Sequence, residues 1–386
     1  MTNSKTTTIA QAALVTSLIL ILGGSPVCPA TSRPRIRELG VRPGNLSPGP
    51  LNAITDVHGV RVGHQTLVQG DSVRTGVTAI LPHDGNLFQS KVPAAVYVGN
   101  GFGKATGFLQ VQELGLLETP IILTNTLSVG TAVTAVVEWT LRQPGNETVQ
   151  SVNAVVGETN DGVLNDIRAL SVESGDVQAA IDAATDGSIS EGNVGAGTGT
   201  RAMGWKAGIG TSSRVLPPDL GGFTVGALVQ SNFGGALMID GVRIGERLSE
   251  QAQASPETGS IMIVLATDAP LGSRNLERLA RRAILALGRV GSLMSNGSGD
   301  FVIAFSTSGS VPYSDKAPDY LARRMRNDRM SPLFQAAVEA VEEAIYNSLL
   351  RADSMSGYRG TTMKALPIRE LEEILSSAGV IDPTPQ

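Results

Sequence analysis

Short runs of aliphatic and β-branched residues alternate with segments of helical periodicity along the first half of the chain. Apolar runs of about 4–8 residues bounded by turn residues are typical of buried strands, and apolar residues at i, i+3 and i+4 are typical of helices. We therefore expect strands at 60–68, 77–81, 94–98, 121–124 and 152–156, and helices at 102–114 and 128–142.

The second half continues this alternation after a glycine-dense segment at 191–213, for which we expect a loop. Leucine and alanine recur at helical spacing through 275–290, with Arg278, Arg281 and Arg282 on the opposite face. Ser331-Pro332 supplies an N-cap and a first-turn proline for a further helix. We also expect strands at 223–230, 260–267 and 301–305 and a hairpin through Asp240-Gly241.

Mixed strands and helices without an internal repeat or a dividing linker predict a single α/β domain of layered sheets and helices. This domain spans residues 31–386, and its first twenty residues carry four prolines that predict an extended arm.

Residues 1–30 have the order of a secretory signal peptide. Lys5 is followed by an apolar run at 10–22 that is too short to span a bilayer, and then by the small-residue site Cys28-Pro29-Ala30. A lipoprotein anchored through Cys28 is the alternative, but Val27 stands before the cysteine where a small residue is wanted. We therefore expect removal of this segment near Ala30 and a periplasmic or secreted protein. The only cysteine of the chain is Cys28, so the mature protein has no disulfide.

Composition argues against several classes of partner. A net charge of −5 and 4% aromatic residues provide neither a basic stripe nor a stacking platform for nucleic acid. The histidines His58, His64 and His83 have no second histidine or cysteine at the spacing of a zinc site. We therefore expect no nucleic-acid partner, no metal and no cofactor.

The junction Gly259-Ser260 stands at the front of the apolar run at 261–266. Most Gly-Ser pairs before a strand are turns. A hydroxyl residue that opens a buried strand after a glycine is also where a self-cleaving hydrolase would carry its N-terminal nucleophile. Spacing alone does not separate these interpretations.

A polar segment, Asn296-Gly297-Ser298-Gly299-Asp300, leads into the strand expected at 301–305. It can be an ordinary turn, since Asn-Gly and Ser-Gly are common turn pairs. Alternatively, Asp300 orients Ser298, which hydrogen-bonds Ser260. A serine hydroxyl needs a proton acceptor, and either this relay or a newly released α-amine could serve.

Two further segments could complete an acyl-transfer site. Asn232 ends an apolar strand and is either a turn residue or an oxyanion donor. Glu158 is one of three carboxylates in 157–166, a segment that is either a solvated loop or the binding site of a substrate ammonium. The glycine-rich run at 192–200 lacks the P-loop ending and the dinucleotide-binding spacing, so we expect a tightly packed loop there.

Five stretches resemble the self-processing β-aminopeptidase and L-aminopeptidase D-Ala-esterase/amidase family, peptidase family S58. The most specific are Gly259-Ser260 with the following Ala-Thr-Asp-Ala-Pro-Leu block, and Asn296 to Asp300. The others are 51–64, 124–130, 158–166 and 191–213, so that the resemblance covers nearly the whole mature chain in order.

The resemblance implies an αββα sandwich like that of N-terminal-nucleophile hydrolases, and a cut between Gly259 and Ser260 into chains 31–259 and 260–386. It implies that Ser260 is the nucleophile, assisted by Ser298 and Asp300, and that Asn232 contributes to the oxyanion hole. Glu158 and Asn160 would lie in the substrate-binding site for a small peptide or amide. It further implies a homotetramer of αβ units.

The chain departs from the family at Asn160, Val163 and Leu127, where aromatic or polar residues are common, which leaves side-chain preference open. Preference for β-residues, D-alanine or ordinary L-residues also stays open. The more distant alternatives are a self-cleaving acetyltransferase, which uses threonine at the cut, and an exported binding protein that kept the fold without the chemistry.

Overall fold

The computed structural model describes residues 1–2, 33–248, 258–313 and 324–382. The chain divides into Met1–Ser32 and Arg33–Gln386, and every helix and strand of the described residues belongs to the second unit. The predicted signal at 1–30 lies outside the described residues apart from its first two. None of the described helices combines the length and apolar character that crossing a bilayer requires.

A large sheet forms the centre of the fold, with the strand order β15-β3-β14-β13-β10-β9 and β4 paired to β3. Only the β13–β14 pair within it is parallel. The strands are β3 (Ser90–Gly101), β4 (Leu116–Leu117), β9 (Ile209–Val215), β10 (Thr224–Asn232), β13 (Thr258–Thr267), β14 (Gly297–Ser306) and β15 (Val311–Pro312).

A smaller sheet has the order β1-β2-β5-β6 and a parallel β5–β6 pair. Its strands are β1 (Arg61–Gln69), β2 (Val73–Leu81), β5 (Ile121–Asn125) and β6 (Val155–Thr159). β6 begins three residues later than the sequence predicts. This shift places Glu158 and Thr159 in the buried strand rather than in a loop.

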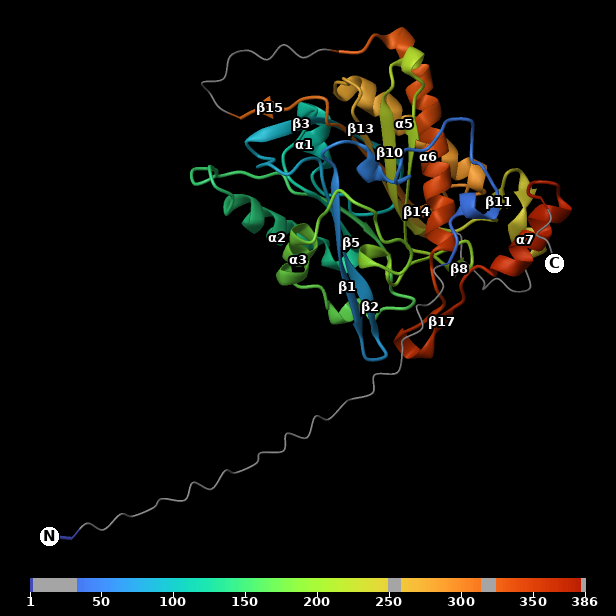
Figure 1. The fold of residues 1–386 in the computed structure, drawn as a ribbon, viewed down its shortest axis with the longest axis horizontal. Helices are drawn as coiled ribbons and strands as arrows, with labels where there is room; N and C mark the ends of the chain where they lie inside the picture. Colours follow the sequence, from blue (N-terminus) through green and yellow to red (C-terminus); the bar gives the residue numbers. More distant parts are fainter. Residues whose placement is uncertain (3–32, 249–257, 314–323, 383–386) are drawn as a thin grey trace. The chain divides into compact units, whose positions relative to one another are not determined.

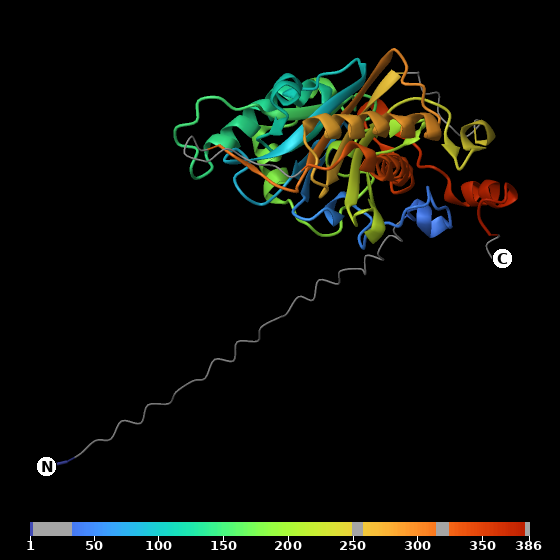
Figure 2. The ribbon, with the colours of Figure 1, turned by 90° about the horizontal axis from the view of Figure 1, so that it is seen from above.

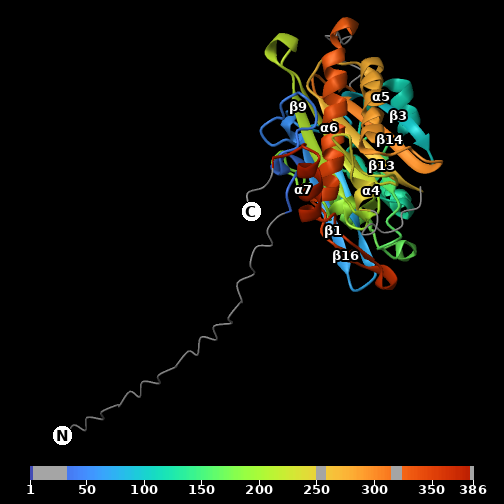
Figure 3. The same cartoon turned by 90° about the vertical axis from the view of Figure 1, so that its right-hand side faces the viewer.

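Two pairs of helices cover the outer faces of the sheets (Figures 1 and 2). α2 (Val129–Leu141) and α3 (Ser174–Asp182) pack on the small sheet, while α5 (Ser273–Val290) and α6 (Ser331–Leu350) pack on the large one. Figure 3 shows α5 and α6 running beside one another over the large sheet. The layers are therefore helix, sheet, sheet and helix, which confirms the expected αββα sandwich.

The side-chain alternation of the central strands separates the apolar core into layers. On β13, Ile261, Ile263 and Leu265 pack toward α5 and α6. Met262 and Val264 pack between the two sheets. A third cluster joins α2 and α3 to the outer face of the small sheet. Both faces of β13 are thus buried, which explains its unbroken apolar run.

Shorter elements extend from this sandwich. The expected hairpin is present, with Asp240 and Gly241 both at positive φ, as a two-residue I′ turn requires. Besides short 3-10 helices, the remaining α-helices and strands of the described residues are α1 (Phe108–Leu114), β7 (Arg201–Ala202), β8 (Trp205–Lys206), β11 (Met238–Ile239), β12 (Val242–Arg243), α4 (Ile244–Arg247), β16 (Met355–Ser356), β17 (Thr362–Met363) and α7 (Ile368–Ser377).

The prediction of a loop at 191–213 is wrong for the last part of this segment, because β9 begins at Ile209. This strand is polar but buried, because its side chains find partners on neighbouring elements. The Thr211 hydroxyl donates to the Ala227 carbonyl at 2.7 Å, and the Ser212 hydroxyl donates to the Ala340 carbonyl at 2.5 Å. The earlier glycines are tightly packed as expected: a Cβ on Gly199 would lie 2.0 Å from the Arg74 carbonyl oxygen.

The helix expected at 102–114 is half as long, because α1 begins only at Phe108. Gly107 precedes it at φ +84°, a conformation that glycine adopts readily and that does not continue a helix. Gly103 packs against the Phe301 ring, and a Cβ added to Gly103 would lie 2.6 Å from a carbon atom of that ring. Two further helices, α3 and α7, are not predicted from the sequence.

Candidate active site

Three neighbouring strands bring the predicted nucleophile segment to one edge of the large sheet. Asn232 on β10 lies opposite Ser260 on β13, and Ser260 lies opposite Gly299 on β14. Because Met262 faces the space between the sheets, alternation points Ser260 to the same side. The candidate nucleophile therefore faces the small sheet.

The Gly259–Ser260 junction is held closely. Ser260 is 6% exposed, and its Oγ accepts a hydrogen bond from the backbone N–H of Gly299 at 3.3 Å. Gly259 has φ +154°, and a Cβ there would lie 2.1 Å from the Asn232 carbonyl oxygen. Only glycine fits immediately before the serine without displacing β10.

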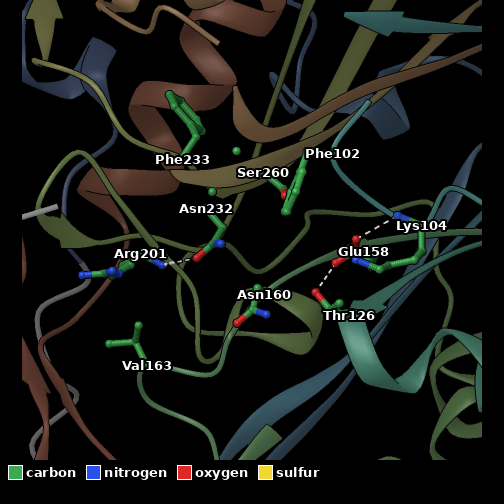
Figure 4. Close-up of a pocket in the computed structure, with 12 residues that line it drawn as sticks. Phe102, Lys104, Thr126, Glu158, Asn160, Val163, Arg201, Asn232, Phe233 and Ser260 are labelled. Atoms are coloured by element: carbon green, nitrogen blue, oxygen red, sulfur yellow. Dashed lines mark hydrogen bonds between the residues drawn. The ribbon is translucent and has the colours of Figure 1, made fainter. Parts of the chain in front are cut away.

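Asn232 presents an amide donor to the pocket. Its Oδ1 accepts a hydrogen bond from the backbone N–H of Arg201 at 3.1 Å. Because an N–H group must point at oxygen, this contact fixes the orientation of the amide. The Nδ2 group is left on the pocket side, as Figure 4 shows, where it can donate to a developing oxyanion.

Ser298 and Asp300 form a buried pair, but not the predicted relay. The Ser298 hydroxyl donates to Asp300 Oδ1 at 2.8 Å, whereas Ser298 and Ser260 make no hydrogen bond to each other in this described region. Gly299 shares the face of Ser260 and Phe301, so alternation turns Ser298 and Asp300 to the opposite face. The pair instead flanks the residue whose N–H contacts Ser260.

Asp300 is fully buried, and burial raises the pKa of its carboxyl to about 6. Its Oδ2 has no partner among the described residues. The hydrogen bond from Ser298 opposes this shift, because it stabilises the charged form.

Glu158 reaches the same pocket from the small sheet. It is 2% exposed, and its Oε1 accepts a hydrogen bond from the backbone N–H of Lys104 at 3.0 Å. Its Oε2 accepts one from the Thr126 hydroxyl. Thr126 is positioned by Asn125, whose Oδ1 caps the turn through the N–H groups of Leu127 and Ser128. The carboxylate is thus fixed at the pocket wall.

The other two carboxylates of this segment do not line the pocket. Asp161 is buried behind it, accepts a hydrogen bond from Asn165 at 3.0 Å, and has its pKa raised to about 7 by burial. Asn160 does line the pocket, and its Oδ1 accepts the N–H of Gly162 at 3.0 Å. Of the predicted substrate-binding residues, Glu158 and Asn160 therefore both face the cavity.

These residues surround a cavity of about 270 Å³ (Figure 4). It is lined by Phe102, Lys104, Thr126, Glu158, Asn160, Val163, Arg201, Asn232, Phe233, Gly259, Ser260 and Gly297. Ser298 and Asp300 are not part of this lining.

Only some residues of this cavity wall are predicted from the sequence. Phe233 follows Asn232 directly, and Arg201 follows the glycine-rich run, so position offered a signal for both. Phe102 and Lys104 gave none, because the segment was expected to be helical. Thr126 was included only through the stretch 124–130.

The chain is similar in sequence and fold to known aminopeptidases. The model of peptidase family S58 matches residues 52–363. The beta-peptidyl aminopeptidase BapA of Sphingosinicella microcystinivorans is 42% identical, over 89% of this chain and 92% of that protein.

Two solved structures have the same fold at a TM-score of 0.84 each. The PH0078 protein from Pyrococcus horikoshii OT3 is 46% identical, over 89% of this chain and 99% of that one. The L-aminopeptidase D-Ala-esterase/amidase from Ochrobactrum anthropi, described as a prototype serine aminopeptidase with a variant of the Ntn hydrolase fold, is 38% identical, over 90% and 100%.

Proposed function

Because the chain belongs to peptidase family S58, we propose that it is a self-processing serine aminopeptidase whose nucleophile is Ser260. The observation that carries this proposal is the geometry of the Gly259–Ser260 junction. One cavity is faced by the Ser260 hydroxyl, the Asn232 amide and the Glu158 carboxylate. The Gly259–Ser260 peptide bond adjoins this cavity, and only glycine fits at position 259.

In the self-cleavage step, Ser260 Oγ attacks the carbonyl carbon of Gly259. The C–N bond to Ser260 breaks, an ester forms between Gly259 and the hydroxyl oxygen, and the nitrogen takes up a proton as a free amine. Water then hydrolyses the ester to the Gly259 carboxylate and the restored hydroxyl. The products are chains 31–259 and 260–386, where the first boundary assumes removal of the signal.

In turnover, the freed α-amine of Ser260 serves as the base for its own hydroxyl, since an α-amine has a pKa of about 8. The hydroxyl attacks the carbonyl of the substrate's first residue while Asn232 Nδ2 holds the oxyanion. The leaving amine departs protonated, and water releases the acyl group. Ser298 and Asp300 assist by fixing Gly299, whose N–H contacts Ser260 Oγ.

Glu158 binds the substrate's ammonium group, and the substrate is a short peptide or amide with an N-terminal β-amino acid. The name of the Sphingosinicella relative supports the β-residue. The alternative is a D- or L-residue, which the name of the Ochrobactrum relative supports. Rates on β-alanine, D-alanine and L-alanine p-nitroanilides rank these possibilities.

We further propose that the protein is exported to the periplasm or the medium and works as a homotetramer of αβ units. The signal-like order of residues 1–30 supports export. Native mass spectrometry of the processed protein tests the assembly, and fractionation of the producing cells tests the location.

The decisive experiment is intact mass and N-terminal sequencing of purified protein under denaturing conditions. Wild-type protein should give two chains, the second beginning Ser-Ile-Met-Ile at Ser260. Ser260→Ala should remain a single chain without aminopeptidase activity, while Ser377→Ala, an exposed serine on α7, should be processed as wild type. Normal processing of Ser260→Ala would exclude it as the nucleophile.

A further inference from the structure

Arg201 is a half-buried cation in the wall of the candidate active site, and no counter-ion for it is found among the described residues. Its guanidinium makes no hydrogen bond or ion pair with any residue that the structure describes. Partial desolvation lowers its pKa from the ordinary arginine value. A guanidinium has five N–H donors, and leaving them unpaired in a partly buried place is costly. An anion that arrives with the substrate would remove that cost.

Lys104, the other cation of the cavity lining, does not meet these conditions. It is exposed to solvent, and its ammonium lies 5.8 Å from the centroid of the Phe102 ring. Its established contact with the site is through its backbone N–H, which donates to Glu158. Water can therefore solvate the charge of Lys104. Of these two cations, only Arg201 is partly desolvated and would be stabilised by a bound anion.

The position of Arg201 indicates which part of a substrate it meets. Its backbone N–H bonds Asn232, so it adjoins the oxyanion donor. Figure 4 shows Asn232 between Arg201 on one side and Glu158 on the other. With the substrate amine at Glu158 and the scissile carbonyl at Ser260 and Asn232, the residue beyond the cleaved bond extends toward Arg201.

We propose that Arg201 binds the free carboxylate of the leaving residue, so that the preferred substrates are dipeptides. This inference rests on the proposed aminopeptidase function. In a dipeptide, the carboxylate lies one residue beyond the scissile bond, and the planar guanidinium can hold it through two parallel hydrogen bonds. A cavity of about 270 Å³ also suits a ligand of this size better than a long peptide.

The test compares two substrates that differ only at the terminal group, β-alanyl-glycine and β-alanyl-glycinamide, or their analogues with whichever first residue the nitroanilides rank highest. Wild type should prefer the acid by roughly 10- to 100-fold in kcat/KM, mainly through KM, which is the range for hydrogen bonds to a charged group. Arg201→Met should bring this ratio close to one. Arg201→Lys should give an intermediate ratio, because it keeps the charge but not the planar fork.

Two control variants separate local binding from general electrostatics. Lys104→Met removes the other cation of the cavity wall, and Arg369→Met removes an exposed arginine of α7. Both should retain a strong preference for the acid.

Equal use of acid and amide by wild type, or an undiminished preference in Arg201→Met, would overturn the role of Arg201. The p-nitroanilide, which has no carboxylate, reports separately on the proposed function. If processed wild type cleaves the nitroanilide without preferring the acid, only the inference about Arg201 fails. If it cleaves none of these substrates, the aminopeptidase function fails and the inference fails with it.

Discussion

Gly259 shows how one residue can limit where the proposed self-cleavage takes place. Its φ of +154° is a conformation that side chains other than glycine rarely adopt, and a Cβ would also lie 2.7 Å from the Phe233 Cα. Both conflicts involve backbone rather than flexible side-chain atoms. Any larger residue must therefore displace either the peptide that we propose is cut or β10, which carries the proposed oxyanion donor.

We expect Gly259→Ala to slow self-cleavage by at least about 100-fold, since a displacement of about 1 Å from the attack geometry can cost that much. The fraction of cut chain on denaturing gels over time measures the rate. Gly288→Ala is the matched control, because Gly288 lies in α5 and a Cβ there would meet no neighbouring atom within 4 Å, so it should cut as wild type. Cutting of Gly259→Ala at the wild-type rate would mean that the junction relaxes before attack.

Asp300 is a buried carboxyl whose pKa is raised by its burial. Its native pKa of about 6 lies above the ordinary aspartate value of 3.8. Between these values the unfolded state releases its proton while the native state keeps it, so stability falls as the pH rises from about 4 to 6. Burial thus favours the neutral form of Asp300 in the folded state relative to the unfolded state.

Asp300→Asn should therefore stabilise the uncut Ser260→Ala protein above pH 6, by on the order of 1–3 kcal/mol, with a gain that shrinks toward pH 4. Urea unfolding at a series of pH values gives this difference in free energy. Asp219→Asn, at an exposed position, should show no such trend. A gain that stayed constant with pH would assign the effect to packing instead of ionisation.

Among the elements, those whose burial follows a simple pattern could be predicted from the sequence. β13 is apolar on both faces, and α5 has one apolar and one basic face, so both were predicted within two or three residues. β9 could not be predicted, because its polar residues are buried only through partners on distant segments. α3 is short, and glycine, serine and acidic residues in its sequence obscure the helical spacing of its three buried apolar residues.

Some residues of the candidate site could likewise be predicted from the sequence, and others could not. Ser260, Asn232, Glu158 and Asn160 face one cavity, as the resemblance implied. The contact between Ser298 and Asp300 was also expected. The face of the sheet on which this pair lies was not, because it depends on the register of β14 against β13. The position of Arg201 after the glycine-rich run is visible in the sequence, but the lack of a charge partner for it is evident only from the residues that the structure describes.

At the scale of the molecule, the proposed cut leaves two interleaved chains. β14 and the part of β13 from Ser260 onward would belong to the second chain, yet β13 pairs with β10 and β14 pairs with β3, both from the first. The two central strands of the large sheet are thus flanked on both sides by the other chain. Because these ladders do not involve the cut bond, the sheet can persist after cleavage.

A buried ion cluster also connects the two proposed chains. Arg214 on β9 is fully buried and pairs with Glu343 at 2.8 Å and with Glu339 at 3.3 Å, both on α6. Arg37, on the N-terminal arm, pairs with Glu343 at 2.7 Å. Breaking a buried pair by removing one partner leaves a charge without compensation, which typically costs about 3–5 kcal/mol.

We therefore expect Arg214→Met to lower the urea concentration at which the processed protein unfolds and its chains separate, as followed by tryptophan fluorescence and size-exclusion chromatography. The loss should be several-fold larger than for Arg369→Met, whose exposed pair with Glu373 contributes roughly 0–1 kcal/mol. In the uncut Ser260→Ala background, Arg214→Met should still lower the unfolding midpoint, but without separating two chains. Equal midpoints for the two arginine variants after processing would show that the strand ladders alone hold the chains together.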